Sequence, residues 1–233
     1  MAMTDTSQQP WRAGLRSARA HLVPGLILQA LALALVLSYY YSASANAALG
    51  RLMDFRRETG FAFAIVSTAI FGGLLPYLYM RCWRGESGLP RYDGRQGLCL
   101  TLYWAYKGFE VDLFYRVMAW TFGGGHDLAT ILPKALVDQF VYCPVIAVPV
   151  MVVVYGWMDA HFCWSPIAAD LRSSGWYYRR VFPVLISNLG VWGPAVAIIY
   201  ALPTPLQLPL QNLVLCFFTL LIAHQMRPKS GET

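Results

Sequence analysis

The chain has 233 residues, of which 57% are hydrophobic and only 13% are charged, whereas about 25% of residues are charged in ordinary soluble domains. This composition excludes an ordinary soluble globular protein and predicts an integral membrane protein. The net charge of +6 does not indicate nucleic-acid binding, because the basic residues cluster in short segments between apolar runs, where membrane proteins carry their topology signals. The five cysteines include no C-x-x-C pair, so neither a zinc site nor a disulfide framework is expected.

The first apolar stretch covers residues 22–41 and is long enough to cross a membrane, since about 20 apolar residues span a hydrocarbon core of about 30 Å. It is longer than the hydrophobic region of a secretory signal, which has about 7–15 residues. We therefore interpret it as a retained, additional N-terminal helix. The charged segment RLMDFRRE at residues 51–58 follows and is interpreted as a short loop.

The second apolar stretch covers residues 60–80 and carries small residues every four positions, at Gly60, Ala64, Thr68 and Gly72. Small residues on one helix face allow two helices to approach closely in lipid, where packing drives association. The spacing therefore predicts a helix-packing face.

The third stretch, residues 98–121, is unusually polar because it contains Lys107, Glu110, Asp112 and Arg116. On a helix, Lys107 and Glu110 share one face, while Asp112 and Arg116 form an i,i+4 pair on another. Neutralisation within the helix is the favoured interpretation. A water-lined path and a pair of catalytic carboxylates are the alternatives.

The fourth stretch, residues 132–157, carries Lys134, Asp138 and Gln139 in its first turns. A carboxylate inside a membrane costs about 2.5 kcal/mol or more, so Asp138 is expected to face protein or water rather than lipid. Two interpretations stay open for Lys134 and Asp138: they line a pore, or they form an i,i+4 pair that locks helices together. Cys143, in the same apolar run, is interpreted as a small hydrophobic residue.

Two more apolar stretches follow at residues 181–202 and 206–224. In the first of them Asn188 and Trp192 are one turn apart on one face, and Pro194 leaves a backbone carbonyl without its helical partner. The chain is thus predicted to be all-α, a multi-pass transmembrane helical bundle of about five spans with Pro-kinked helices. Residues 1–233 are expected to form a single integral membrane domain.

Three segments resemble the Mpv/PMP family of small peroxisomal and mitochondrial inner-membrane proteins. GFEVDLFYRVM (108–118) resembles the family segment G-P-x-x-H-x-W-Y, and KALVDQFVYCP (134–144) is similar to its K-x-x-x-D-Q-x-x-x-x-P signature. SNLGVWGPAVAIIYALP (187–203) resembles N-x-x-x-W-P-x-x-Q-x-x-N-F-x-x-V-P. The resemblance extends over about residues 100–225 and marks the chain as a divergent member.

The chain departs from the family pattern at several positions. Phe109 and Asp112 replace the expected Pro and His, and Gly193 is inserted between Trp192 and Pro194. The helix at 22–41 is additional, since the family has four spans. The positions that carry over are Lys134, Asp138, Gln139, Pro144, Asn188, Trp192 and Pro194.

The resemblance implies a channel-like protein that passes small solutes or ions, or one that modulates membrane homeostasis. It also implies a bacterial inner membrane, or an organellar inner or peroxisomal membrane in a eukaryote. The expected partners are the lipid bilayer, small solutes or ions and further copies of the chain in a homo-oligomer, with no nucleic acid. The residues proposed to line a pore or a polar interior are Lys107, Glu110, Asp112, Arg116, Lys134, Asp138, Gln139, Asn188, Trp192 and Pro194.

A non-conducting membrane scaffold is the alternative function. In that case the charges would be satisfied internally, and the aromatic-rich loop at residues 157–180 would bind a partner. An enzyme is not expected, because no Ser-His dyad or H-E-x-x-H motif is present. Neither a cofactor nor a metal is expected, since Asp159, His161 and Cys163 lack a further ligand at a recognisable spacing.

Overall fold

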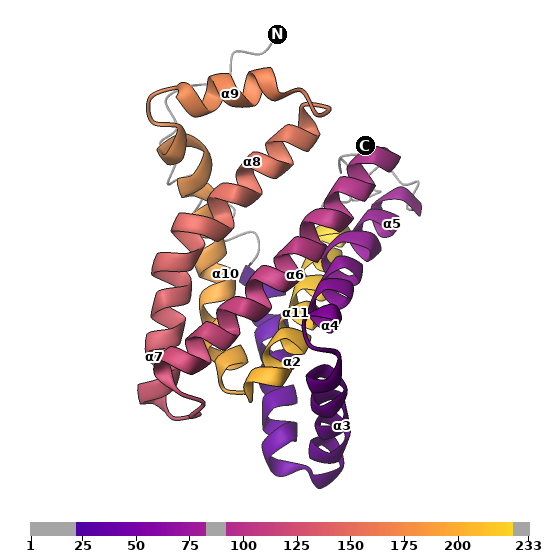
Figure 1. Ribbon diagram of the computed structural model, residues 1–233, viewed down its shortest axis with the longest axis vertical. Coiled ribbons are helices and arrows are strands. Elements are labelled where there is room, and N and C mark those ends of the chain that lie inside the picture. The colour runs from indigo at the N-terminus through magenta and orange to yellow at the C-terminus, as the bar shows by residue number, and fades with distance from the viewer. Residues whose placement is uncertain (1–21, 83–91, 226–233) are drawn as a thin grey trace, which may run out of the picture. The chain divides into compact units, whose positions relative to one another are not determined.

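The computed structural model describes residues 22–82 and 92–225, and all regular elements within these ranges are helices (Figure 1). The prediction of an all-α chain is therefore confirmed for the described residues. The chain divides into two compact units. One unit contains Ala135–Val196, and the other contains Pro24–Lys134 together with the chain from Ala197 onward.

The larger unit begins with two helices, α2 (Leu22–Tyr41) and α3 (Ala43–Thr59). Ser42 separates them and caps α3, because its side chain accepts a hydrogen bond from the backbone N–H of Ala45 at 3.4 Å. The two helices meet at an angle of 100°. Helix α3 ends at Gly60, whose φ of +57° is readily adopted only by glycine.

The predicted loop at residues 51–58 is wrong, because these residues belong to α3. Arg, Leu, Met and Glu are good helix formers, and Arg57 donates a hydrogen bond to Asp54 one turn earlier, at 3.3 Å. The charged side chains of this segment lie on a helix, where Arg56 is buried and the other four are exposed.

The second predicted stretch forms one bent run of helix. It comprises α4 (Phe61–Thr68), the π-helical segment η1 (Ala69–Leu74) and α5 (Leu75–Cys82). This run packs along α6 (Gly94–Phe122), as Figure 1 shows. The face that contacts α6 is the one that carries the regularly spaced small residues, as predicted.

The small-residue face is confirmed at three of its four positions. Ala64 and Thr68 are buried, with 0% and 1% of their surface exposed, and Gly72 is buried as well. On the facing helix, a Cβ atom added to Gly108 would overlap the backbone carbonyl of Ala64. Gly60 lies outside this contact, since a Cβ added there would meet no atom within 4 Å.

Helix α6 has 29 residues and begins with a capping box. The Asp93 side chain accepts from the backbone N–H of Gln96 at 2.8 Å, and the Gln96 side chain accepts from the backbone N–H of Asp93 at 2.9 Å. Helix α11 (Thr204–Gln225) packs against α6, η1 and α3. Both helices extend the predicted stretches by only a few residues.

The fourth predicted stretch is continuous helix from Leu128 to Asp159. Its 32 residues correspond to a length of about 48 Å at about 1.5 Å per residue. It contains α7 (Leu128–Val137), the ten-residue π-helix η2 (Asp138–Ala147) and α8 (Val148–Asp159).

The smaller unit continues with a short helix, α9 (Trp164–Arg172), inside the segment 157–180 that was predicted to be a loop. The chain enters its next long helix through the π-helical segment η3 (Tyr177–Val181) and continues as α10 (Phe182–Tyr200). Helix α8 packs against both α9 and η3.

In the part of the chain that the structure describes, three helices are long and apolar enough to span a membrane: Phe61–Tyr79, Leu128–Asp159 and Tyr177–Tyr200. The bent pair of α2 and α3 makes a fourth if it counts as one span. Helix α6 does not meet the same criterion, because four charged side chains lie between its residues 107 and 116. These helices make the chain compatible with an integral membrane protein.

Candidate functional site

An ion-pair network joins α3 to α6 in the larger unit. The Asp112 side chain, 0% exposed, forms ion pairs with Arg56 of α3 and with Arg116 one turn further along α6. Both Nε and Nη2 of Arg116 lie 3.1 Å from Asp112 Oδ2. The predicted i,i+4 pair is therefore present, but it is half of a larger network whose other half, Arg56, was not predicted.

Arg56 is buried, with 3% of its surface exposed, and links three elements. Besides its ion pair with Asp112, its Nη1 donates to the backbone carbonyl of Thr204 at the start of α11, at 2.7 Å. Arg116 also lies over the ring of Phe61, with Cζ 4.6 Å from the ring centroid. A buried charge of this kind needs such partners, because an unpaired one would be costly.

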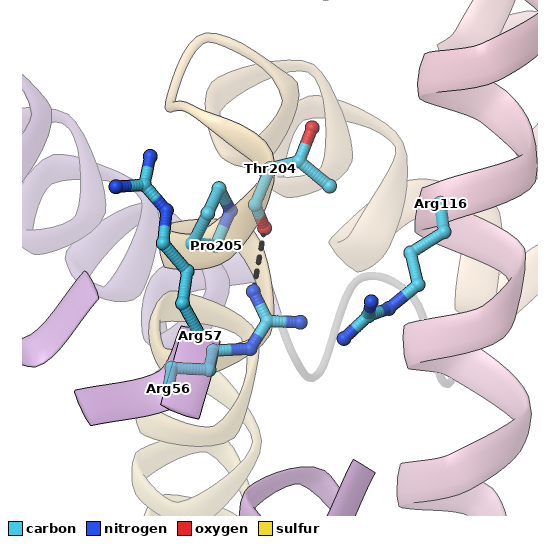
Figure 2. A pocket seen from close by; sticks show the side chains of 5 residues that line it. All are labelled: Arg56, Arg57, Arg116, Thr204 and Pro205. Carbon is cyan, nitrogen blue, oxygen red and sulfur yellow. Dashed lines mark hydrogen bonds between the residues drawn. The ribbon is translucent and has the colours of Figure 1, made fainter. Parts of the chain in front are cut away.

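A pocket of about 170 Å³ opens beside this network. Figure 2 shows the guanidinium groups of Arg56 and Arg116 extending toward one another from α3 and α6. The pocket is lined by Arg56, Arg57, Arg116, Thr204 and Pro205. We call this feature the arginine pocket.

The other predicted charges of α6 are also paired. Lys107 and Glu110 form an i,i+3 ion pair, and their side chains are 6% and 14% exposed. This pair matches the predicted neutralisation within the helix. The pair places opposite charges side by side on one face of α6.

Asn212 of α11 is a further buried polar residue that the sequence analysis did not single out. Thr68 donates to its side-chain oxygen at 2.9 Å, and its amide donates to Ser67 at the same distance. These bonds tie α4 to α11 at the small-residue face. Spacing gives no signal for them, because the partners are about 145 positions apart.

The smaller unit holds a second group of polar side chains, which we call the polar cluster: Asp138, Gln139, Cys143 and Asn188. The amide of Gln139 donates to Asp138 at 3.0 Å and lies 3.7 Å from Cys143 Sγ. Cys143 Sγ lies 3.6 Å from Asp138 Oδ1, and the amide of Asn188 reaches the same sulfur at 3.6 Å. Predicted residues from two helices thus meet at a cysteine that was predicted to be only a hydrophobic residue.

The cluster lies on π-helical backbone. Pro144 has no N–H, so it cannot complete the α-helical ladder, and the wider ladder continues to Val148, whose N–H bonds to the carbonyl of Cys143. Such π-segments often occur at functional sites. Within the described residues, the side-chain oxygen of Gln139 is buried and accepts no hydrogen bond.

The other residues that were predicted for this region are Lys134, Trp192 and Pro194. Lys134, 1% exposed, places Nζ 5.8 Å from the centroid of the Tyr200 ring. On α10, Trp192 is half-buried and Pro194 is exposed.

Within residues 22–82 and 92–225, no group of three His, Cys, Asp or Glu side chains is placed to hold a metal ion. Cys99, Cys143, Cys163 and Cys216 are free thiols. The groups that the polar cluster offers are hydrogen-bonding ones.

No family model matches this chain, and comparisons with curated proteins and with solved structures found no match either. The resemblance to the Mpv/PMP family stays a prediction.

Proposed function

We propose that this chain is a channel-like, multi-pass membrane protein that passes small solutes or ions. The observation that carries the proposal is the polar cluster, where a carboxylate, two amides and a thiol meet on helices that are otherwise apolar. Polar side chains within membrane spans are expensive and usually mark solute or ion pathways. In this proposal the cluster is the narrow part of the path.

The position of the cluster suits this role. Asp138 lies ten residues after Leu128, which is about 15 Å along the helix at about 1.5 Å per residue. In this proposal that position falls within the hydrocarbon layer, where a passing solute loses its water. The acceptor oxygen of Gln139, which has no hydrogen-bond partner among the described residues, can replace part of that water.

The proposal extends to architecture and family. About five spans with Pro-kinked helices would place the cluster inside a bundle, as in the Mpv/PMP family, which the K-x-x-x-D-Q-x-x-x-x-P signature at residues 134–144 resembles. The membrane would be a bacterial inner membrane or an organellar one. Further copies of the chain would complete a homo-oligomeric pore.

The test is single-channel recording of the purified protein in planar bilayers, with Asp138→Asn beside the wild type. We expect discrete openings whose conductance or ion preference changes in the variant, because the path loses a charge. Asp54→Asn is the matched control, since its side chain is exposed and distant in sequence from the cluster. Correctly folded wild-type protein that never conducts would contradict the proposal.

A non-conducting scaffold is the second candidate, and the internal pairing of charges on α6 favours it. Asp112 and Lys107 both have ion-pair partners, as a scaffold requires. The surface for a partner would be the aromatic side chains around α9 and η3, where Trp164 and Tyr178 are 53% and 48% exposed. A stoichiometric partner that copurifies with the wild type and is lost on Trp164→Ala with Tyr178→Ala would support it.

A further inference from the structure

The arginine pocket combines open volume with one sign of charge. Its volume of about 170 Å³ is roughly ten times the 10–15 Å³ that one water molecule requires. Of its five lining residues, three are arginines and none is acidic. The pocket therefore has room for a group of several heavy atoms in a positive field.

The carboxylates near the pocket do not balance its arginines. Among the described residues, Asp112 is shared between Arg56 and Arg116, and Arg57 pairs with the exposed Asp54, at 3.3 Å. Two carboxylates thus face three guanidinium groups, and the difference of one positive charge favours an anion.

Hydrogen-bond donors also remain available. Arg56 Nε is buried and has no hydrogen-bond partner in the described part of the chain, and an unsatisfied buried donor is costly. Arg116 uses Nε and Nη2 on Asp112, and Arg57 uses Nη1 on Asp54. Each guanidinium carries five N–H donors, so all three retain donors for an additional acceptor.

We propose that the arginine pocket binds an oxyanion of the phosphate type. Such a group has several acceptor oxygens and suits the planar fork of arginine, which pairs with phosphate through two parallel hydrogen bonds. The side chains of Arg57 and Arg116 are 60% and 46% exposed, so the ligand can reach them from outside. The phosphate belongs either to a lipid headgroup or to a soluble molecule.

The experiment measures binding by the full-length protein in neutral detergent. In one arm, the thermal midpoint is followed against inorganic phosphate, with chloride at equal ionic strength as the reference, because a ligand that binds only the folded state raises the midpoint. In the other arm, native mass spectrometry compares adducts of phosphatidylglycerol with those of phosphatidylcholine. We expect saturable binding in at least one arm.

The variants are Arg57→Gln, Arg57→Lys and Arg116→Gln, with Arg51→Gln as the matched control. Arg51 is an exposed arginine of the same helix α3 that does not line the pocket. We expect at least a tenfold loss of affinity for Arg57→Gln and Arg116→Gln, a smaller loss for Arg57→Lys, and wild-type affinity for the control. Arg56 is left unchanged, because its removal would leave Asp112 partly unpaired and could prevent folding.

The outcomes separate the sources and can overturn the proposal. Binding of inorganic phosphate without preference for phosphatidylglycerol indicates a soluble ligand, and preference for phosphatidylglycerol alone indicates a headgroup. Equal losses in Arg51→Gln and Arg57→Gln would show that only general surface charge acts, which contradicts a built site. No binding above chloride and phosphatidylcholine by folded wild-type protein also contradicts it. None of these readouts depends on conductance, so the inference stands or falls separately from the proposed channel.

Discussion

The polar cluster around Cys143 and the ion-pair network around Asp112 both provide bonding partners for buried polar side chains. They differ in how far apart these partners lie along the chain. Three members of the cluster lie within residues 138–143, and the fourth, Asn188, is 45 positions from Cys143. The network joins Asp112 to Arg56, and Arg56 to the carbonyl of Thr204, 148 positions away.

The two regions also differ in chemistry. In the cluster, the buried carboxylate of Asp138 is bonded by an amide and a thiol. In the network, the buried carboxylate of Asp112 is paired with two guanidinium groups, and breaking a buried ion pair is very costly. We therefore expect substitutions in the network to lower the free energy of unfolding more than substitutions in the cluster. A weaker cluster also suits the proposed function, because a passing solute would replace the hydrogen bonds within it.

The largest expected effect comes from Asp112→Ala, which leaves Arg56 buried without a carboxylate. Breaking a buried pair in this way typically costs about 3–5 kcal/mol. The measurement is the free energy of unfolding in mixed micelles. Asp54→Ala is the control, because its exposed pair with Arg57 is worth at most about 1 kcal/mol. Equal stability of the two variants would show that the network does not hold α3 to α6.

A smaller effect is expected where α4 and α6 approach each other. Gly108→Ala places a Cβ against the carbonyl of Ala64, and overpacking of this kind costs about 1–3 kcal/mol. The matched control is Gly50→Ala, because a Cβ there meets no atom within 4 Å and alanine favours a helix by about 1 kcal/mol. Opposite signs of the two changes in unfolding free energy are expected. A neutral Gly108→Ala would mean that α4 and α6 separate easily.

Within the polar cluster the expected effect is smaller again. A double-mutant cycle of Cys143→Ala and Asn188→Ala should give a coupling free energy of about 0.6 kcal/mol, the average for hydrogen bonds between membrane helices. A coupling free energy of several kcal/mol would show that the cluster contributes as much to stability as the network, which contradicts the expected difference between the two regions.

The smallest effect is expected outside both regions, at the start of α7. Thr130 donates to Asp127 from its hydroxyl at 2.9 Å and from its backbone N–H at 3.1 Å, and the hydroxyl bond is the main cause that lowers the pKa of Asp127 below its usual value. A carboxyl whose pKa is lowered on folding stabilises the folded state above its unfolded pKa of about 3.9, and this contribution is lost as the pH falls through the lower folded pKa. The thermal midpoint of Asp127→Ala should therefore lie slightly below that of the wild type at pH 7 and approach it at strongly acidic pH. A gap that persists unchanged in acid would contradict this account.

Much of the fold could be predicted from local pattern. Residues 22–41 and 60–80 are apolar over the length of a span, and both are helical in the structure. The charged segment at residues 51–58 was misinterpreted, because a short run of charges is typical both of a loop and of an exposed helix. The ion pair of Asp112 with Arg116 could also be predicted from the sequence, because residues four positions apart on a helix are neighbours.

The all-α class, the positions of most helices and the ion pairs within α6 could be predicted from the sequence alone. Helical periodicity depends only on residues that are close in the sequence, so these features can be predicted without knowing the tertiary structure. The tertiary structure alone decided that Arg56 pairs with Asp112, that Cys143 joins Asn188, and that three arginines surround one pocket. These contacts join residues tens of positions apart, and which of them meet depends on how the helices pack.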